Sequence, residues 1–413
     1  MLPRVRVLRS LYVCYLSIAD PLVDSQVLAY LDGLAATGHT IHLLSFEPAG
    51  GDRAQRHRVR AALRDRGIHW HRLRYHKRPS LPATLYDVLC GTLACVWLVR
   101  RHRLHAIHAR NHVPAAMALL AAPLAPHRLI FDLRGLMGQE YVDAGRWPAG
   151  GIAARLTARV QRAGLRRAVG IVVLTERVRS ILFGTGAAGH DGVFVIPCCA
   201  DVERIAAGRD GRERTRERLR LSGRRVLVYV GKFGGWYMDA ELAQLFAVAS
   251  EAIDDLHLLV ITQADAGGLR ALLAARGVDA GRCTVTSIAH DRLGEALGAA
   301  DAGLALIAPM PSKVASSPTK VSECLAAGLP VIATAIGDTG ELLGGGGTGV
   351  VLTEFTDAAY RRAAGELTAL IDDPRTAERC IALARARLSL AEVGLPRYRA
   401  LYEHVAAHGT SSR

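Results

Sequence analysis

Short apolar runs alternate with longer helical patterns along this chain, and the alternation starts again in its second half. One helical pattern, over residues 25–37, ends at Gly38. Such alternation favours parallel sheets whose strands are joined by helices. The predicted strands lie near residues 5–14, 40–46, 105–109, 128–133, 170–174, 193–197, 225–231, 256–261, 283–287, 303–307, 331–334 and 349–352. We therefore predict an α/β fold of two Rossmann-like units.

The division between the two units is predicted just after the apolar run 193–197. The stretch 209–214 that follows is charged and too polar for a core. A chain of 413 residues has room for about two domains or more. We place a first domain at 1–205 and a second domain at 206–388.

The segment 316–334 reads as a loop, a helix, a turn and a buried strand. Ser317 can cap a helix whose first residue is Pro318, where a missing N–H costs nothing. Gly328 can end this helix in a left-handed conformation, and Pro330 blocks its continuation. The pattern places a helix N-terminus directly after a loop.

Lys320 and Glu323 are three residues apart and share one face of the first turns of this helix. Free N–H groups at a helix N-terminus, with a lysine beside them, form an anion site suited to a diphosphate. A carboxylate one turn further along can accept hydrogen bonds from a ribose diol. The alternative is an ordinary helix with a surface lysine and glutamate.

The net charge of the chain limits the classes of binding partner that are expected. The formal net charge is +14, which favours phosphorylated substrates, anionic lipid or nucleic acid. We find no zinc-finger spacing and no aromatic-basic RNA signature, so no nucleic-acid partner is expected. The eight cysteines form no Cys-x-x-Cys pair and mostly lie in apolar runs, which predicts buried free thiols. Residues 1–10 resemble a first strand and not a signal peptide.

One segment, 85–99, is largely apolar and is followed at once by basic residues at 100–103. Its length of about 15 residues is short of the roughly 20 needed to cross a bilayer, and it contains Asp87. It could be a buried helix of the first domain. It could also lie at a membrane interface, with the basic residues between 72 and 78 attracted to anionic lipid.

Taken together, these segments resemble a bacterial family 4 glycosyltransferase of the GT-B type over nearly the whole chain. The motifs that carry the resemblance lie at 21–26, 108–114, 131–135, 173–176, 195–197, 228–232 and 316–331. The resemblance implies two Rossmann-like domains that face each other across a cleft. It also implies a C-terminal segment, 389–413, that crosses back to the first domain.

By this resemblance, a nucleotide-sugar donor binds mainly to the second domain. Glu323 matches the second glutamate of the Glu-x7-Glu motif, which hydrogen-bonds the donor ribose, whereas the first glutamate is replaced by Ala315. The expected donor-binding residues are Gly231, Lys232, Ser316, Ser317, Thr319, Lys320 and Glu323. The leaving nucleoside diphosphate needs fixed cations or helix-end dipoles, so no metal or other cofactor is expected.

The acceptor is expected in the first domain, where candidate residues follow predicted strands. Ligands bind at the carboxyl ends of parallel strands in such folds. The candidate catalytic residues are Arg110, Asp132 and Arg134. Asp132 and Arg134 could instead simply pair with each other. The candidate acceptor or phosphate loop consists of Asp24, Ser25 and Gln26, for which a plain helix N-cap is equally open.

The leading hypothesis is a retaining glycosyltransferase that moves a hexose-type sugar from a nucleotide diphosphate donor to a glycan or lipid-linked acceptor. Retention, and a role in cell-surface polysaccharide or glycolipid synthesis, follow from the resemblance alone. We expect a cytoplasmic protein that is peripheral on the inner face of the cell membrane. Two alternatives stay open: a nucleotide-sugar epimerase of the same fold, and a non-catalytic nucleotide-sugar-binding partner of an active transferase, which Ala315 supports.

Overall fold

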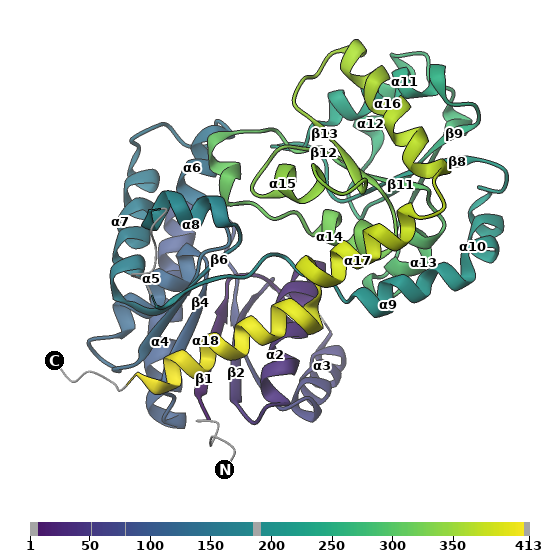
Figure 1. Ribbon diagram of the computed structural model, residues 1–413. Helices are drawn as coiled ribbons and strands as arrows, with labels where there is room; N and C mark the ends of the chain where they lie inside the picture. The colour runs from purple at the N-terminus through teal and green to yellow at the C-terminus, as the bar shows by residue number, and fades with distance from the viewer. Residues whose placement is uncertain (1–6, 51, 79, 185–190, 409–413) are drawn as a thin grey trace. The chain divides into compact units, whose positions relative to one another are not determined.

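The structure is a computed structural model that describes residues 7–50, 52–78, 80–184 and 191–408. The chain divides into two compact units, Met1–Pro197 with Gly394–Arg413, and Cys198–Val393. Each unit is built on its own parallel sheet with helices packed against it (Figure 1). The prediction of two Rossmann-like α/β units is confirmed.

The sheet of the first unit has the strand order β3-β2-β1-β4-β5-β6-β7. Its strands are β1 (Arg9–Cys14), β2 (Thr40–Glu47), β3 (Ile68–Arg74), β4 (Ala106–Arg110), β5 (Arg128–Asp132), β6 (Ala168–Val173) and β7 (Val193–Val195). All pairings are parallel, and the order changes direction at β1, which sends the connecting helices to opposite faces. The central strand β4 is buried along its whole length because both faces are covered.

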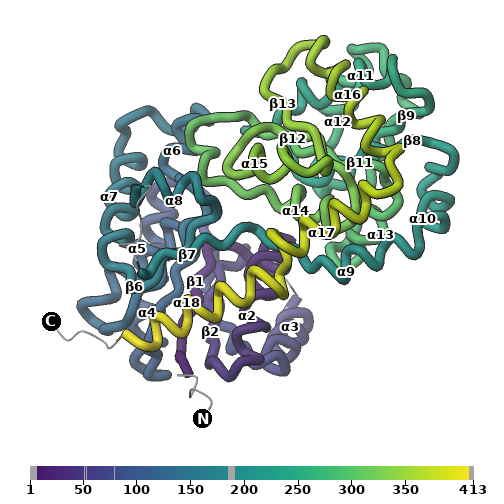
Figure 2. Tube along the Cα trace, in the orientation of Figure 1, coloured from purple at the N-terminus to yellow at the C-terminus, as the bar shows by residue number. Residues whose placement is uncertain are grey.

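The helices of the first unit include one from the end of the chain. They are α1 (Pro21–Val23), α2 (Ala29–Ala35), α3 (Arg53–Asp65), α4 (Ser80–His102), α5 (His112–Ala121), α6 (Met137–Asp143), α7 (Ile152–Arg167), α8 (Glu176–Phe183) and α18 (Leu395–Ala407). A π-helical turn, Asp24–Leu28, joins α1 to α2. Helix α18 runs along this unit (Figure 2), where Arg128 donates a hydrogen bond to the Val405 carbonyl at 2.9 Å.

The second unit has a six-stranded sheet in the order β10-β9-β8-β11-β12-β13. Its strands are β8 (Arg225–Val230), β9 (Leu256–Ile261), β10 (Cys283–Thr286), β11 (Ala302–Ala305), β12 (Val331–Thr334) and β13 (Gly349–Leu352). Its helices are α9 (Val202–Ala206), α10 (Arg212–Leu219), α11 (Asp239–Ala252), α12 (Gly267–Ala274), α13 (Leu293–Gly298), α14 (Thr319–Ala326), α15 (Thr339–Leu343), α16 (Asp357–Asp372) and α17 (Thr376–Leu388). Gly328 follows α14 with φ 72°, which is the predicted left-handed stop.

The sequence analysis missed strand β3. It lies at the edge of its sheet, where Ile68 and Trp70 are buried and the intervening residues are polar. Its alternation of apolar and polar side chains is therefore that of a half-exposed strand and not of a fully buried one. Consequently Arg72 and Arg74 belong to the sheet and are not part of a basic loop before α4.

The predicted boundary at 205/206 differs from the division after Pro197. Val202 and Ile205 of α9 are buried in the core of the second unit, so this unit begins earlier. At its other end, Ser389 forms a bridge with Ala200, and the second unit therefore extends beyond 388 to Val393.

The charged stretch 209–214, expected to lie outside a core, is also built into the second unit. Arg209 donates to the Ala327 carbonyl at 2.8 Å, and Arg212 donates to the Gly298 carbonyl at 2.7 Å. These carbonyls lie at the C-terminal ends of α14 and α13, where arginines satisfy unpaired oxygens and favour the helix dipole.

Candidate functional site

Lys320 lies in the first turn of α14 and is buried, with 6% of its surface exposed. Its Nζ lies 4.2 Å from the centroid of the Tyr229 ring and 4.7 Å from that of Tyr237. Among the residues that the structure describes, this nitrogen has no hydrogen-bond partner. Burial lowers the pKa of Lys320 to about 8. The arrangement is a cation held by aromatic faces and lacking an anion.

Gly231 leaves room for this ammonium group because it has no side chain. It follows β8 with φ 145°, and a Cβ at this position would lie 3.0 Å from the Nζ of Lys320. The next residue, Lys232, is exposed, and its carbonyl accepts a hydrogen bond from the Tyr229 hydroxyl at 2.6 Å. The glycine is therefore needed both for its backbone conformation and for the close approach of the lysine.

Glu323 lies one turn further along α14 and is 7% exposed. Burial raises the pKa of Glu323 to about 7, against the opposing charges of Lys320 and Arg204. A buried lysine and a buried carboxyl with pKa values displaced toward neutrality, on one turn of a helix, are typical of ligand-binding sites.

The remaining predicted donor residues lie at the start of α14. Ser316 and Thr319 are half-buried there. Ser317 does not cap the helix as predicted, because the cap position is Pro318 and the helix begins at Thr319. The Ser317 hydroxyl instead accepts a hydrogen bond from the backbone N–H of Cys198 at 3.1 Å. A serine that is paired in this way ties the loop before α14 to the start of the second unit.

The sequence analysis missed Lys313. Its side chain is buried, and its Nζ lies 3.8 Å from the centroid of the Trp236 ring. The sequence feature that could have indicated it is a second lysine, seven residues before Lys320, in a loop rich in serine and proline. Ala315, where the family motif has a glutamate, is itself buried, at 2% exposure.

In the first unit, Asp132 is fully buried at the end of β5, in register with Arg110 at the end of β4. Nη1 of Arg110 lies 3.5 Å from Oδ2 of Asp132, and Nη1 of Arg134 lies 3.6 Å from Oδ1. Burial opposes ionisation, but Arg134, His108 and Arg110 hold the pKa of Asp132 well below its usual range. The three predicted catalytic residues thus lie together, and the pair of Asp132 with Arg134 is present.

Further aromatic residues complete this cluster, and the tyrosines among them were missed by the sequence analysis. The hydroxyls of Tyr12 and Tyr398 donate to Oδ2 of Asp132 at 3.4 and 3.3 Å. His108 lies 3.6 Å from the same oxygen and contacts the Tyr402 hydroxyl at 3.2 Å. Two of the tyrosines belong to α18, so no local pattern in β4 or β5 could have indicated them.

The three residues of the predicted loop at 24–26 differ in their surroundings. Gln26 is buried and joins the cluster: its carbonyl accepts from Arg110 at 3.3 Å, and its Oε1 accepts from Arg134 at 3.4 Å. Asp24 is exposed, and the Ser25 hydroxyl donates to the carbonyl of Pro21 in α1 at 3.2 Å. Neither of these two is a helix N-cap, since the N-cap residue of α1 is Asp20 and that of the π-helical turn is Val23.

Asn111, also missed, has an unusual backbone between β4 and α5. Its φ is 69° and its ψ is −173°, although it is not a glycine. Its N–H donates to the Asp132 carbonyl at 2.8 Å, and its side chain caps α5 by accepting from the N–H of His112 at 3.0 Å. Strained residues of this kind are concentrated at functional sites.

A cavity of about 450 Å³ lies in the first unit at the carboxyl ends of β1 and β2. Its lining includes Ser17, Glu47, Arg56, Arg66, Trp70 and Arg72. Glu47 is held in place by the Ser17 hydroxyl at 2.6 Å and the Ile18 N–H at 2.9 Å. The cavity combines an aromatic wall with fixed polar groups, as small-ligand sites do.

The two halves of the chain match two families. Residues 23–204 match the family described as Glycosyltransferase Family 4, and residues 224–370 match the family described as Glycosyl transferases group 1. The 2-deoxystreptamine glucosyltransferase of Streptomyces kanamyceticus is 30% identical over 198 residues. This match covers 46% of the chain and 48% of the relative, so it spans about half the length of each.

Solved structures share the fold at low identity. Sucrose-phosphate synthase from Thermosynechococcus elongatus has a TM-score of 0.74 at 16% identity, and the match covers 97% of this chain and all of that one. Anabaena HepE, solved in complex with UDP and glucose, has a TM-score of 0.68 at 15% identity, with 96% and 99% covered. At these identities the likeness shows the fold alone, which is that of two Rossmann-like domains.

Proposed function

Because this chain belongs to glycosyltransferase family 4, we propose that it transfers a sugar from a nucleoside diphosphate sugar to a glycan or lipid-linked acceptor. We propose retention of the anomeric configuration and a role in cell-surface polysaccharide or glycolipid synthesis, as the resemblance implies. UDP-glucose is the first donor to test, because the matched relative is a glucosyltransferase and HepE was solved with UDP and glucose.

The observation that carries the proposal is the buried ammonium of Lys320. It sits at the N-terminus of α14 over the rings of Tyr229 and Tyr237, without a hydrogen-bond partner among the described residues. A diphosphate would supply the missing anion and would also meet the N–H groups of the helix end. Negative charge beside Lys320 would raise its pKa again and keep it protonated through the reaction.

The same site can stabilise the leaving group. Charge develops on the departing diphosphate in the transition state, where fixed cations and helix-end dipoles act without reorganisation. We assign this role to Lys320, and we assign to Glu323 the hydrogen bonds to the ribose hydroxyls. We assign Gly231, Lys232, Ser316 and Thr319 to the rim of the donor site. No metal is required by this set of groups.

For the acceptor we propose the cavity of the first unit. Trp70 can stack on a sugar ring, and the fixed carboxylate of Glu47 can accept hydrogen bonds from hydroxyl groups. Arg110 and Arg134 outweigh the single charge of Asp132, so we propose that they bind negative charge on a substrate. Asp132 would act as a positioning residue for both arginines.

The test measures nucleotide release from a panel of nucleotide sugars, with and without acceptor lipids or glycans. A transferase releases nucleotide and joins the sugar to the acceptor, and NMR of the product reports the anomeric configuration. An epimerase would release nucleotide and epimerised sugar without an acceptor. A non-catalytic partner would bind nucleotide, seen as a raised melting temperature, and release none. Absence of both binding and release would refute the donor site.

We also propose that the first unit attaches to an anionic membrane surface through α4. Among the described helices, only α4 is long and apolar enough to span a bilayer, and 39% of its apolar window is buried within the protein. The packed face carries Asp87, which is buried and accepts from the Tyr15 hydroxyl at 2.7 Å. A helix packed along one side suits the membrane surface better than a span.

The other face of α4 is an exposed apolar stripe. Every fourth residue contributes a large apolar side chain that is 38–58% exposed: Leu81, Leu85, Leu89, Leu93 and Trp97. Exposed basic residues lie at both ends of the helix: Lys77, Arg78, Arg100, Arg101 and Arg103. Arg72 lines the cavity instead, so it is not counted here. Apolar side chains flanked by cations fit an anionic bilayer surface.

Flotation with anionic and neutral vesicles tests this attachment. We expect binding to anionic vesicles that weakens with salt, and a loss of binding on Leu89→Glu with Leu93→Glu. Changing Lys77, Arg78, Arg100 and Arg101 to Gln should cost about 1 kcal/mol for each residue near the surface. Ile181→Glu on α8, which is also exposed, is the matched control. Equal binding to neutral vesicles, or unchanged binding of the α4 variant, would contradict the proposal.

A further inference from the structure

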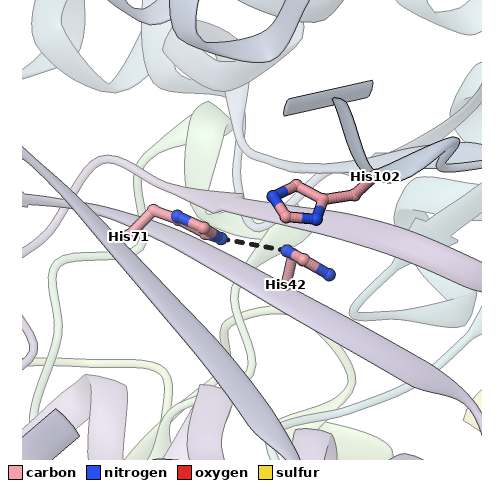
Figure 3. Close-up of side chains that lie close together, drawn as sticks. All are labelled: His42, His71 and His102. Carbon is pink, nitrogen blue, oxygen red and sulfur yellow. Dashed lines mark hydrogen bonds between the residues drawn. The ribbon is translucent and has the colours of Figure 1, made fainter. Parts of the chain in front are cut away.

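Three histidines from separate parts of the sequence meet in the first unit (Figure 3). The Nδ1 of His42 lies 2.9 Å from the Nε2 of His71, and the ring of His102 lies 4.4 Å from that of His42 between centroids. One ring nitrogen from each residue lies within 4.8 Å of the other two. His42 is buried, whereas His71 and His102 are half-buried and open to solvent on one side.

The fold produces this group through strand register. β2 and β3 pair in parallel, with Leu44 opposite His71, and His42 lies two residues before Leu44. Since side chains two apart point to the same face of a sheet, His42 and His71 share one face. His102, the last residue of α4, reaches the same face from above the strands.

We propose that His42, His71 and His102 bind a divalent transition metal ion of the zinc type, with water or an outside ligand in the fourth position. Zinc takes imidazole nitrogens at about 2.0–2.1 Å, which in a tetrahedron places them about 3.3 Å apart. The ligand atoms lie within 4.8 Å of one another, so we expect side-chain rotations to close them on an ion. The open side at His71 and His102 provides the entry path.

The surroundings select the class of metal. Metal ions bind imidazole through an unprotonated ring nitrogen, and each of the three histidines can offer one such nitrogen to a shared ion. The arginines that act on these rings, Arg9, Arg60 and Arg101, are cations and offer no oxygen ligand. Magnesium and calcium prefer oxygen ligands, whereas zinc, copper and nickel accept three imidazoles.

A metal here would be structural and separate from the proposed donor and acceptor sites. His42 lies near the start of β2, and His102 precedes β4, so the group is at the amino ends of these strands. The candidate residues of the first unit, such as Asp132, lie at the carboxyl ends. A bound ion would fasten the C-terminal end of α4 to the edge strand β3 and to its neighbour β2, where the helix dipole also favours positive charge.

The test uses the full chain without a histidine tag, stripped with chelator and titrated with Zn²⁺ or Co²⁺. We expect about one equivalent to bind at this site and the melting temperature to rise with metal, because an ion that binds the folded state stabilises it. Co²⁺ should give the strong visible bands of a tetrahedral site without the near-ultraviolet bands of thiolate ligands. This distinction matters because all eight cysteines are free.

Single changes to Ala at His42, His71 and His102 should each weaken binding at least about tenfold, since even outer-shell partners contribute about 10–100-fold. His102→Gln, at the half-exposed position, keeps the test open if His42→Ala fails to fold. His57→Ala, an exposed histidine on α3, is the control and should bind as the parent does. Absent binding, thiolate bands, or equal binding by the three variants would overturn the proposal.

Discussion

Replacing Lys320 by methionine separates the stability of this protein from its proposed function. The change keeps the long side chain that packs over Tyr229 and Tyr237 but removes the buried charge. We expect the folded protein to become more stable while nucleotide binding is lost. If Lys320 instead stabilised the fold and bound no ligand, the variant would be less stable and its nucleotide binding would be unchanged.

The size of the stability gain follows from the pKa of Lys320, which is lowered from 10.5 to about 8. At about 1.36 kcal/mol for each pKa unit, the protonated side chain costs the folded state about 3 kcal/mol. Its contacts with the two aromatic rings offset about 1–2 kcal/mol of this cost. The net gain of about 1–2 kcal/mol corresponds to a rise of about 2–8 °C in the melting temperature of the second unit.

The pH dependence of the stability provides an independent check that the buried charge of Lys320 destabilises the folded protein. Below pH 8 the lysine is protonated in both states, so the folded protein bears the full cost. Between pH 8 and 10.5 only the unfolded chain keeps the proton, so the stability of the parent rises and the advantage of the variant shrinks.

Thermal melts across this pH range, with and without UDP, provide the assay. UDP should raise the melting temperature of the parent and not that of Lys320→Met. The control is Arg387→Met, an exposed cation on α17 of the same unit, which should keep the response to UDP. A variant that is less stable than the parent at pH 7, or that still responds to UDP, would refute the reasoning.

Three further changes test the other parts of the two sites. Glu323→Gln should weaken UDP binding by about 1.5–3 kcal/mol in titration calorimetry. Because the pKa of Glu323 is raised to about 7, the parent loses stability as pH rises from 4.5 to 7, and melts of the variant should not show this loss. Gly231→Ala should abolish UDP binding and destabilise the protein by about 1–3 kcal/mol, whereas Gly345→Ala, in open space, should be nearly neutral in both measurements. Asp132→Ala should cost about 3–5 kcal/mol in denaturant unfolding, because two buried arginines lose their carboxylate, and a change below 1 kcal/mol would contradict the pairing.

The sequence by itself determined the fold class and most of the strands. The composition of runs such as β8 and β9 already indicates that they are buried, because strands covered on both faces consist mostly of apolar residues. Helix α14 and its stop at Gly328 were predictable for a similar reason, since turn and cap chemistry is local. Strand β3 was missed because it alternates like a half-exposed edge, and the Ser317 cap was wrong because Cys198, distant in the sequence, takes its hydroxyl.

Only the tertiary structure decided the chemistry of the sites. Lys320 could be recognised as a helix-end cation, but its burial over Tyr229 and Tyr237 depends on a strand and a loop that precede it by more than eighty residues. The partners of Asp132 on α18, and the meeting of His42 with His102, arise in the same way. A pKa, an ion pair or a metal site depends on distance and burial, and periodicity along the chain reports only on neighbours within a turn or a strand.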